Sequence, residues 1–327
     1  MALRTRLTER LGVRHPIISA PMGHFAGGAL AAAVTRAGGL GLIGGSYGDG
    51  DWLRRQASAA GAERVGCGFI TWSLAKRPEL LDEGLARRPA AIMLSFGRPA
   101  QFAAPIKQAG VPLICQVQSK AHAREAIDAG ADIIVAQGGE AGGHSGKRST
   151  LTLVPEVADL LAEIAPDTLL VAAGGVADGR ALAAALMLGA DGVLIGSRLV
   201  ASSEAETPEG FLPRILAADG DATVKTTVLD IVRGYGWPGD EFSARAIENR
   251  FVSAWRGREA ALTESATNAT ERERYWRAFH SGDADNAGVM IGEAVGLIRD
   301  VRPARVILDT MVSQAERLFK TGIERLV

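Results

Sequence analysis

Residues 137–146 place five glycines around a single imidazole, that of His144. Glycine lets the backbone approach a ligand closely. An imidazole titrates near neutral pH, so it can accept or donate a proton during catalysis. The segment therefore predicts one wall of a ligand site that presents His144 to a substrate. The alternative, a structural hydrogen-bonding histidine, stays open.

Two later pairs, Gly174-Gly175 and Gly196-Ser197, each follow a short apolar run and precede a helical pattern. Turns of this kind expose backbone N–H groups, and the start of a helix adds partial positive charge. Together they can hold a phosphate without Lys or Arg. The two pairs therefore predict a phosphate site, and the simpler alternative is that both are only tight turns.

Eight short apolar runs alternate with helical patterns and position these loops. Strands of a parallel sheet that helices cover on both faces have this composition. The runs are residues 17–20, 40–43, 65–69, 91–96, 113–117, 133–137, 169–173 and 192–195. We therefore predict an α/β protein with a (β/α)8 TIM barrel, whose reactive groups lie at the carboxyl ends of the strands. An open doubly wound sheet is the alternative.

The chain changes character after about residue 203. Aromatic residues such as Trp255 and Trp276 stand among many Glu and Arg residues, without the alternation that strands require. We predict a barrel over residues 1–204 and a mostly helical lid or insert domain over residues 205–290. Residues 291–327 are predicted to form helices that return to the barrel.

Composition argues against several classes of partner and site. The 36 Lys and Arg nearly balance the 37 Asp and Glu, so neither a nucleic acid nor an anionic membrane is expected as the main partner. The two cysteines and five histidines lack the number or spacing of a disulfide scaffold or a metal site. No apolar run suits a membrane span, and the first ten residues lack the core of a signal peptide. We expect a cytoplasmic protein with a small-molecule substrate, and a homodimer is compatible with the sequence.

Four segments resemble the nitronate monooxygenase family, the former 2-nitropropane dioxygenases, which are FMN-dependent (β/α)8 barrels. The segments are residues 16–22, 136–144, 172–179 and 189–198, and they occur in the family's order and spacing. The run Glu-Ala-Gly-Gly-His at residues 140–144 is the most specific of these matches. The resemblance implies an FMN cofactor bound to the barrel of residues 1–204.

The resemblance also implies roles for individual residues. His144 would be the catalytic imidazole beside the substrate. The residues implied to bind FMN are Ala20, Pro21, Met22, Gly68, Gln116, Gln137, Gly142, Gly174, Gly175, Ile195, Gly196 and Ser197. The last two loops would hold the phosphate, in agreement with the site inferred from the glycines alone. The family often carries Asn in the third strand, where residues 66–69 are Gly-Cys-Gly-Phe, so one flavin or substrate contact is replaced.

The family reaction oxidises an alkyl nitronate, such as propionate 3-nitronate, with O2 to a carbonyl compound and nitrite. The resemblance therefore implies a nitronate monooxygenase-like flavin oxidoreductase. In it, His144 would abstract the α-proton of a neutral nitroalkane or hold an anionic nitronate. The alternative is a flavin-dependent NAD(P)H reductase of the enoyl-acyl carrier protein reductase or quinone reductase type, which shares the Glu-Ala-Gly-Gly-His segment. A non-catalytic flavin- or phosphate-binding barrel is a third interpretation.

Overall fold

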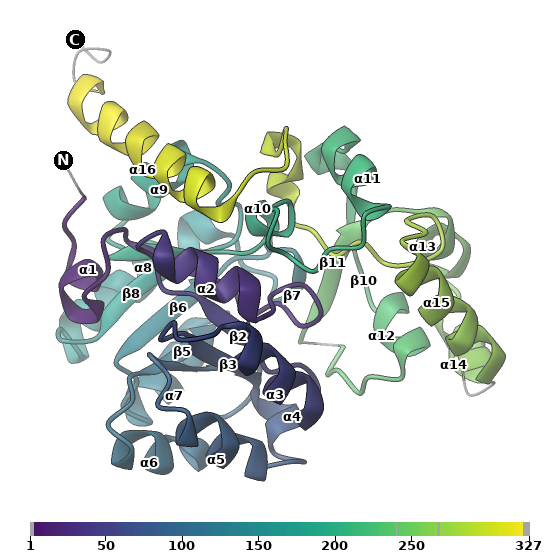
Figure 1. The fold of residues 1–327 in the computed structure, drawn as a ribbon, viewed down its shortest axis with the longest axis horizontal. Helices are drawn as coiled ribbons and strands as arrows, with labels where there is room; N and C mark the ends of the chain where they lie inside the picture. The colour runs from purple at the N-terminus through teal and green to yellow at the C-terminus, as the bar shows by residue number, and fades with distance from the viewer. Residues whose placement is uncertain (1–2, 240, 267–268, 323–327) are drawn as a thin grey trace.

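The computed structural model describes residues 3–239, 241–266 and 269–322, and its core is a barrel of eight parallel strands (Figure 1). Each predicted apolar run overlaps one strand, which confirms the (β/α)8 TIM barrel. The sheet closes where β1 pairs with β9 on one side and Ile18 bridges to Leu40, just before β2, on the other. The barrel strands are β1 (Ile17–Ser19), β2 (Leu42–Gly44), β3 (Gly66–Ile70), β4 (Ile92–Ser95), β5 (Leu113–Val117), β6 (Ile133–Gln137), β8 (Leu169–Ala173) and β9 (Gly192–Ile195).

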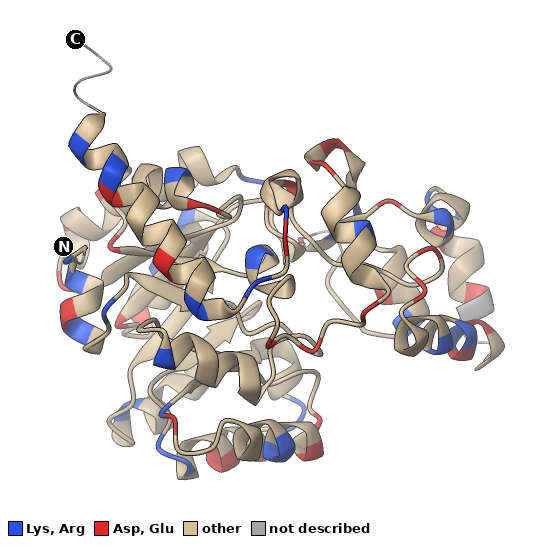
Figure 2. Cartoon of the chain, turned by 45° about the horizontal axis from the view of Figure 1, so that its top comes forward, with Lys and Arg blue, Asp and Glu red and all other residues tan. Residues whose placement is uncertain are grey.

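The barrel strands are apolar because both of their faces are covered. In β6, Ile133 and Val135 belong to the cluster inside the barrel, whereas Ile134 and Ala136 pack against the surrounding helices. Leu7 joins the inner cluster and reaches Gly192 at the beginning of β9. The barrel strands carry no charged residue, and most charged residues lie on helices and loops (Figure 2).

Helices surround the barrel and connect its strands. The N-terminus of α7 is capped by Ser119, whose hydroxyl accepts a hydrogen bond from the backbone N–H of His122 at 3.1 Å. After α7 the chain turns into β6 through Gly130, whose φ of +74° suits glycine. The helices of this part are α1 (Arg6–Leu11), α2 (Gly28–Arg36), α3 (Gly50–Ala59), α4 (Thr71–Leu74), α5 (Glu79–Ala86), α6 (Ala100–Gln108), α7 (Lys120–Asp128), α8 (Thr150–Ile164), α9 (Gly179–Met187), α10 (Ser197–Val200) and α16 (Ala304–Thr321).

A second region lies beside the barrel, between α10 and α16 in the chain (Figure 1). It has an apolar core of its own, which includes Phe211, Val252 and Tyr275. Helix α16 then packs against α9 and α2 of the barrel. The elements of the second region are α11 (Phe211–Ala217), η1 (Gly220–Ala222), β10 (Thr223–Thr226), α12 (Val228–Arg233), β11 (Ser243–Ile247), α13 (Arg250–Trp255), α14 (Glu259–Ala266), α15 (Ala269–Ser281) and η2 (Glu293–Leu297).

Strands β10 and β11 differ from the mostly helical composition expected for residues 205–290. They form an antiparallel sheet with β7 (Gly143–Ser145), a short strand in the loop after β6, in the order β10-β11-β7. Both strands are short. β10 pairs with β11, and β11 pairs with β7 from far earlier in the chain, where Ala244 lies opposite His144. Local sequence pattern does not report pairing over such a separation. The sheet joins the glycine-rich loop to the second region.

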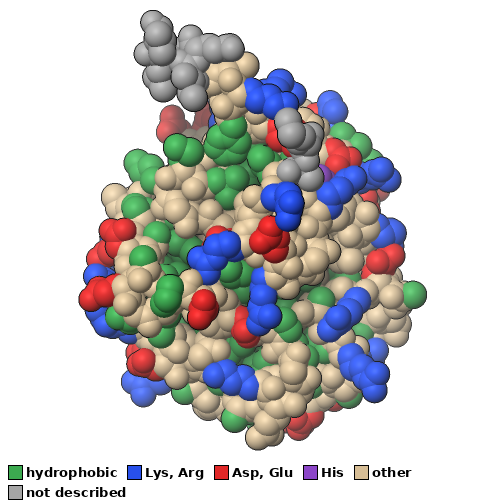
Figure 3. Space-filling model, turned by 90° about the vertical axis from the view of Figure 1, so that its left-hand side faces the viewer, with side chains coloured by type: hydrophobic (Ala, Val, Ile, Leu, Met, Phe, Trp, Pro, Cys, Tyr) green, Lys and Arg blue, Asp and Glu red, His purple; other side chains and the backbone are tan. Residues whose placement is uncertain are grey.

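The surface carries charges of both signs. On the face that Figure 3 shows, basic and acidic side chains lie interspersed among apolar and uncharged ones. Among the residues that the structure describes, no helix combines the length and the apolar composition needed to span a membrane.

Candidate active site

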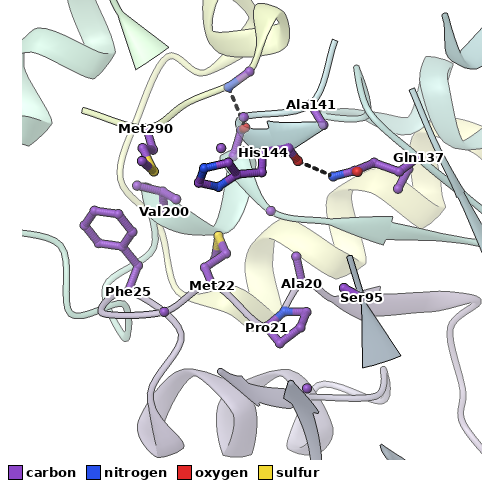
Figure 4. Close-up of a pocket in the computed structure, with 18 of the residues that line it drawn as sticks. Ala20, Pro21, Met22, Phe25, Ser95, Gln137, Ala141, His144, Val200 and Met290 are labelled. Atoms are coloured by element: carbon purple, nitrogen blue, oxygen red, sulfur yellow. Dashed lines mark hydrogen bonds between the residues drawn. The ribbon is translucent and has the colours of Figure 1, made fainter. Parts of the chain in front are cut away.

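A cavity opens at the carboxyl ends of the barrel strands, where the second region meets the barrel (Figure 4). Its wall combines backbone from the loops after β1, β3, β6, β8 and β9 with side chains from the second region. The predicted site residues that line it are Ala20, Pro21, Met22, Gly68, Gln116, Gln137, Gly142, His144, Gly174, Gly175, Gly196 and Ser197. The structure therefore brings residues from the carboxyl ends of six strands together around one cavity.

Ile195 is the exception among the predicted site residues. Its side chain is fully buried in the cluster between the strands and the helices, together with Leu199. The preceding residue, Leu194, points inward and lines the cavity. Successive side chains of a strand face opposite sides, so the Ile195 side chain faces away from the cavity, and its contact with FMN stays a prediction.

The backbone of His144 is held from two directions. Strand β7 pairs with β11, and the Gln137 side chain donates from Nε2 to the carbonyl oxygen of His144 at 3.1 Å. The Oε1 atom of Gln137 in turn accepts from the amides of Gln116 at 3.1 Å and Gln118 at 2.9 Å. The three glutamines thus connect β5 and β6 to the loop that carries His144, and Gln118 was not foreseen from the sequence.

The His144 side chain meets a buried carboxylate. Its Nε2 lies 2.8 Å from Oδ2 of Asp230, and both side chains are only 5% exposed. The second oxygen, Oδ1, accepts from Nη2 of Arg233 at 2.9 Å. We call His144, Asp230 and Arg233 the mouth cluster. Helix α12, which directly follows β10, supplies the aspartate and the arginine, so the three-stranded sheet is what brings this helix to His144.

The surroundings of His144 determine its protonation. Burial lowers the pKa of His144, and the hydrogen bond with Asp230 offsets only part of that effect. The imidazole is therefore neutral near pH 7. Because both oxygens of Asp230 act as acceptors, Nε2 must carry the proton, and Nδ1 keeps the basic lone pair. A neutral imidazole in this tautomer can accept a proton.

Aromatic rings pack over His144. The ring of Trp237 stacks on the imidazole, with centroids 3.4 Å apart and planes 6° from parallel. Trp237 also donates from Nε1 to the hydroxyl of Tyr47 at 3.2 Å, and Tyr47 stacks on Tyr235. These contacts make one side of the cavity apolar and shield it from water.

The cavity wall also contains residues with strained backbone conformations. Among the described residues, four other than glycine have a positive φ, and three of them, His24, Ser46 and Phe96, line the cavity. Such conformations cost of order 1 kcal/mol each and persist where the surrounding structure imposes them. The Nε2 atom of His24 is also buried without a hydrogen-bond partner in the described part of the chain. Concentrated strain at the barrel mouth is typical of a functional site.

The glycines of the last two loops form a cradle of backbone. Gly174 and Gly175 have φ values of +97° and +74°. The Ser197 hydroxyl accepts from the backbone N–H of Gly292 at 2.9 Å. A Cβ on Gly142 would lie 2.5 Å from that nitrogen, so side chains larger than hydrogen are excluded where these segments meet. Backbone amides from neighbouring loops, with no acidic side chain among the described residues that line the cavity, suit a phosphate group.

Besides Gln118, several residues of the site were missed from the sequence, and most of these lie beyond residue 205. The second region contributes Asp230, Arg233, Trp237, Met290 and Gly292. One signal was present, because Asp230 and Arg233 stand three residues apart within an otherwise apolar stretch that ends at Gly234. Charges within a short apolar helix indicate a buried pair, although the partner cannot be read from the pattern.

Comparison with known proteins gives one family and a consistent fold. The profile of the nitronate monooxygenase family matches residues 4–62 and 76–314. A protein named nitronate monooxygenase npaC, from Metarhizium robertsii, is 35% identical, over 95% of this chain and 93% of that protein. A protein of Mycobacterium tuberculosis named (3aS,4S,5R,7aS)-5-hydroxy-7a-methyl-1-oxo-octahydro-1H-indene-4-carboxyl-CoA dehydrogenase is 34% identical, over 85% of this chain and 78% of that protein.

Solved structures agree with the barrel. The structure of FabK from Thermotoga maritima superposes with a TM-score of 0.85 at 29% identity. The alignment covers 99% of this chain and all of FabK, so the second region is matched along with the barrel.

Proposed function

We infer, from the premise that the chain belongs to the nitronate monooxygenase family, that it oxidises alkyl nitronates such as propionate 3-nitronate with O2 to a carbonyl compound and nitrite. The chain is a flavin-dependent oxidoreductase of this family. The observation that carries the specific reaction is the neutral, buried imidazole of His144, paired with Asp230, in the wall of the cavity.

FMN is the flavin that the cavity suits best. Its phosphate would meet the backbone amides of the glycine cradle, where Gly175 leaves room for a negatively charged group. The flavin ring would lie against Ala20, Pro21 and Met22, beside Gly68, where a Cβ would collide with the ring of Pro21. Bound FMN supplies the electron transfer between the substrate and O2. The amide of Gln116 is placed at the cavity wall to contact the flavin, whereas Gln137 is mainly engaged with protein groups.

The residues of the mouth cluster would accept the α-proton of the substrate. When a neutral nitroalkane binds, Nδ1 of His144 takes the α-proton, and the electron pair of the broken C–H bond stays on the substrate as the nitronate. Asp230 holds the imidazole in the required tautomer and stabilises the positive charge that forms. When the substrate binds as a nitronate, this proton is already absent and His144 orients the anion instead. Trp237 keeps water away from the imidazole.

A flavin-dependent NAD(P)H reductase is the second candidate. It is favoured by the 34% identity to the mycobacterial dehydrogenase and by the full-length match to FabK. In that case His144 would donate a proton to the reduced product rather than accept one from the substrate. A cytoplasmic location and a homodimer stay predictions from the sequence.

Anaerobic mixing distinguishes the two functions. The purified protein with its flavin is mixed in separate experiments with propionate 3-nitronate, NADH and NADPH, and the visible flavin absorbance is followed. We expect the nitronate to bleach the flavin and nitrite to appear when O2 is admitted. Rapid bleaching by a nicotinamide, without a response to the nitronate, would overturn the proposed reaction. Release of the bound flavin and its chromatography against FMN and FAD tests the cofactor.

A further inference from the structure

Arg233 is the charged residue of the cavity wall. Among the described residues that line the cavity, it alone carries a formal charge, because His24 and His144 both have a pKa lowered by burial. Its own side chain is only 7% exposed. Burial by itself disfavours the charged form, but the surrounding Tyr275, Tyr47 and Asp230 raise the pKa of Arg233 above its ordinary value. A permanent cation therefore faces an otherwise neutral cavity.

The hydrogen bonds of Arg233 leave part of its guanidinium unused. Nε donates to the carbonyl of Leu229 at 2.8 Å, and Nη2 donates to Asp230 at 2.9 Å. Within the part of the chain that the structure describes, Nη1 meets only the sulfur of Met290, at 4.0 Å, which is a weak acceptor. A guanidinium has five N–H groups, and burying unsatisfied charged donors is costly. Arg233 and Met290 both line the cavity, so the unused edge of Arg233 lies at the cavity wall.

The guanidinium is also held in place. Its carbon lies 5.2 Å from the ring centroid of Tyr235, a cation–π contact, and Tyr235 stacks on Tyr47 with centroids 3.8 Å apart. Asp230 bridges it to His144, so a ligand that touches the guanidinium edge also lies close to the imidazole. A rigid planar fork beside the catalytic imidazole suits a planar oxyanion.

We propose that Arg233 is a specificity-determining residue, which binds the two oxygens of a nitronate directly and makes the site prefer this anion over the neutral nitroalkane. This inference rests on the proposed function. The preference arises because only the nitronate carries a net negative charge, which lies largely on its two oxygens. The neutral nitro group presents two coplanar oxygens of similar size and spacing, so the charge on these oxygens is what distinguishes the two forms at Arg233. Positioning of His144 through Asp230 would not by itself produce such a preference.

The test compares one compound in two protonation states. The kcat/KM is measured for ethyl nitronate and for nitroethane with the wild-type holoenzyme, Arg233→Lys and Arg233→Met. If Arg233 binds the anion, Arg233→Met lowers the ratio of nitronate to nitroethane kcat/KM by at least about tenfold, and Arg233→Lys lowers it less. An equal loss for both substrates, with an unchanged ratio, would overturn the inference. Asp309→Asn, outside the cavity, is the control that leaves the ratio unchanged.

A binding measurement keeps the inference testable without turnover. Nitrate, a planar oxyanion that does not react, is titrated into the holoenzyme, and the perturbation of the flavin spectrum gives its Kd. We expect Arg233→Lys to bind nitrate more weakly than wild type. This variant keeps the test possible if Arg233→Met does not fold. Equal nitrate affinity in both would contradict the inference. Failure of the proposed function gives a different result, because wild type would then not oxidise ethyl nitronate at all.

Discussion

Two clusters of one histidine, one aspartate and one arginine lie at opposite ends of the barrel. The mouth cluster follows β6 and β10 at the carboxyl ends of the strands. The second, which we call the floor cluster, consists of His15 just before β1, Asp309 on α16 and Arg14. In both clusters the histidine is buried and its Nε2 meets the carboxylate, at 2.8 Å in the mouth cluster and 3.1 Å in the floor cluster.

The clusters differ in exposure and in the partners of the imidazole Nε2. Asp309 and Arg14 are 44% and 49% exposed, whereas every side chain of the mouth cluster is nearly inaccessible. Nε2 of His15 lies within hydrogen-bond distance of both the Arg14 Nε donor, at 3.0 Å, and the Asp309 carboxylate, so these contacts do not fix its tautomer. In the mouth cluster both oxygens of Asp230 accept, and Nε2 of His144 is the donor. The same residue types therefore fix the imidazole tautomer only at the carboxyl ends of the strands, where the chemistry of such barrels lies.

The largest contrast is expected when each aspartate is neutralised. Asp230→Asn leaves the buried guanidinium of Arg233 without its counter-charge, so we expect the free energy of unfolding to fall by about 3–5 kcal/mol. Asp309→Asn removes an exposed pair and should cost less than about 1 kcal/mol. Urea denaturation of both variants and wild type measures the difference. Equal losses would mean that burial does not separate the two clusters.

The pH dependence of stability tests a property that the two clusters share, the lowered pKa of a buried histidine. Burial lowers the pKa of both His15 and His144. Above pH 6.5 both are neutral in the folded and the unfolded chain. As the pH falls below 6.5, the unfolded chain binds protons that the folded chain does not, so the free energy of unfolding decreases, by up to about 1.4 kcal/mol per pH unit and histidine. Full stability is therefore retained above pH 6.5.

The variants His15→Gln and His144→Gln check that assignment between pH 6.5 and 5.5. Each should make the decrease in unfolding free energy less steep than in wild type. A stability that rises as the pH falls through this range would show that the histidines become charged in the folded protein.

The smallest expected effect comes from replacing one glycine of the cradle at the cavity and one glycine of a similar turn far from it. Gly175 at the mouth and Gly110 before β5 both have positive φ, +74° and +66°, and neither would bring a Cβ into close contact. Alanine at either position should destabilise the protein by about 1 kcal/mol. Only Gly175→Ala should also weaken FMN binding, by about three- to tenfold, measured by fluorescence titration of the flavin-free protein. Equal FMN affinity in the two variants would contradict the proposal that this loop binds the FMN phosphate.

The barrel could be predicted because its signal is local. Each strand is apolar on both faces, so eight separate runs stand out, and the glycine-rich loops after them are visible in the same way. His144 was found for this reason. The placement of Ile195 has a local cause as well, since the alternation of side chains along a strand turns Leu194 toward the cavity and Ile195 away from it.

The remainder of the site depends on contacts between distant parts of the chain. Asp230 reaches His144 only because β10 pairs with β11 and β11 pairs with β7, and these strands are too short to show a pattern of their own. Arg233 becomes a cavity residue through the same arrangement. Such pairing depends on tertiary packing and not on the composition of any single segment.

The most direct test of the account asks whether His144 takes a proton from the substrate. Anaerobic flavin bleaching is followed after mixing with nitroethane or with ethyl nitronate, for wild type, His144→Gln and His15→Gln. We predict that His144→Gln slows the reaction with nitroethane by about 10²–10⁴-fold but affects the preformed nitronate far less, while His15→Gln reacts with both like wild type. Equal slowing of both substrates by His144→Gln, or no slowing of either, would contradict the central claim.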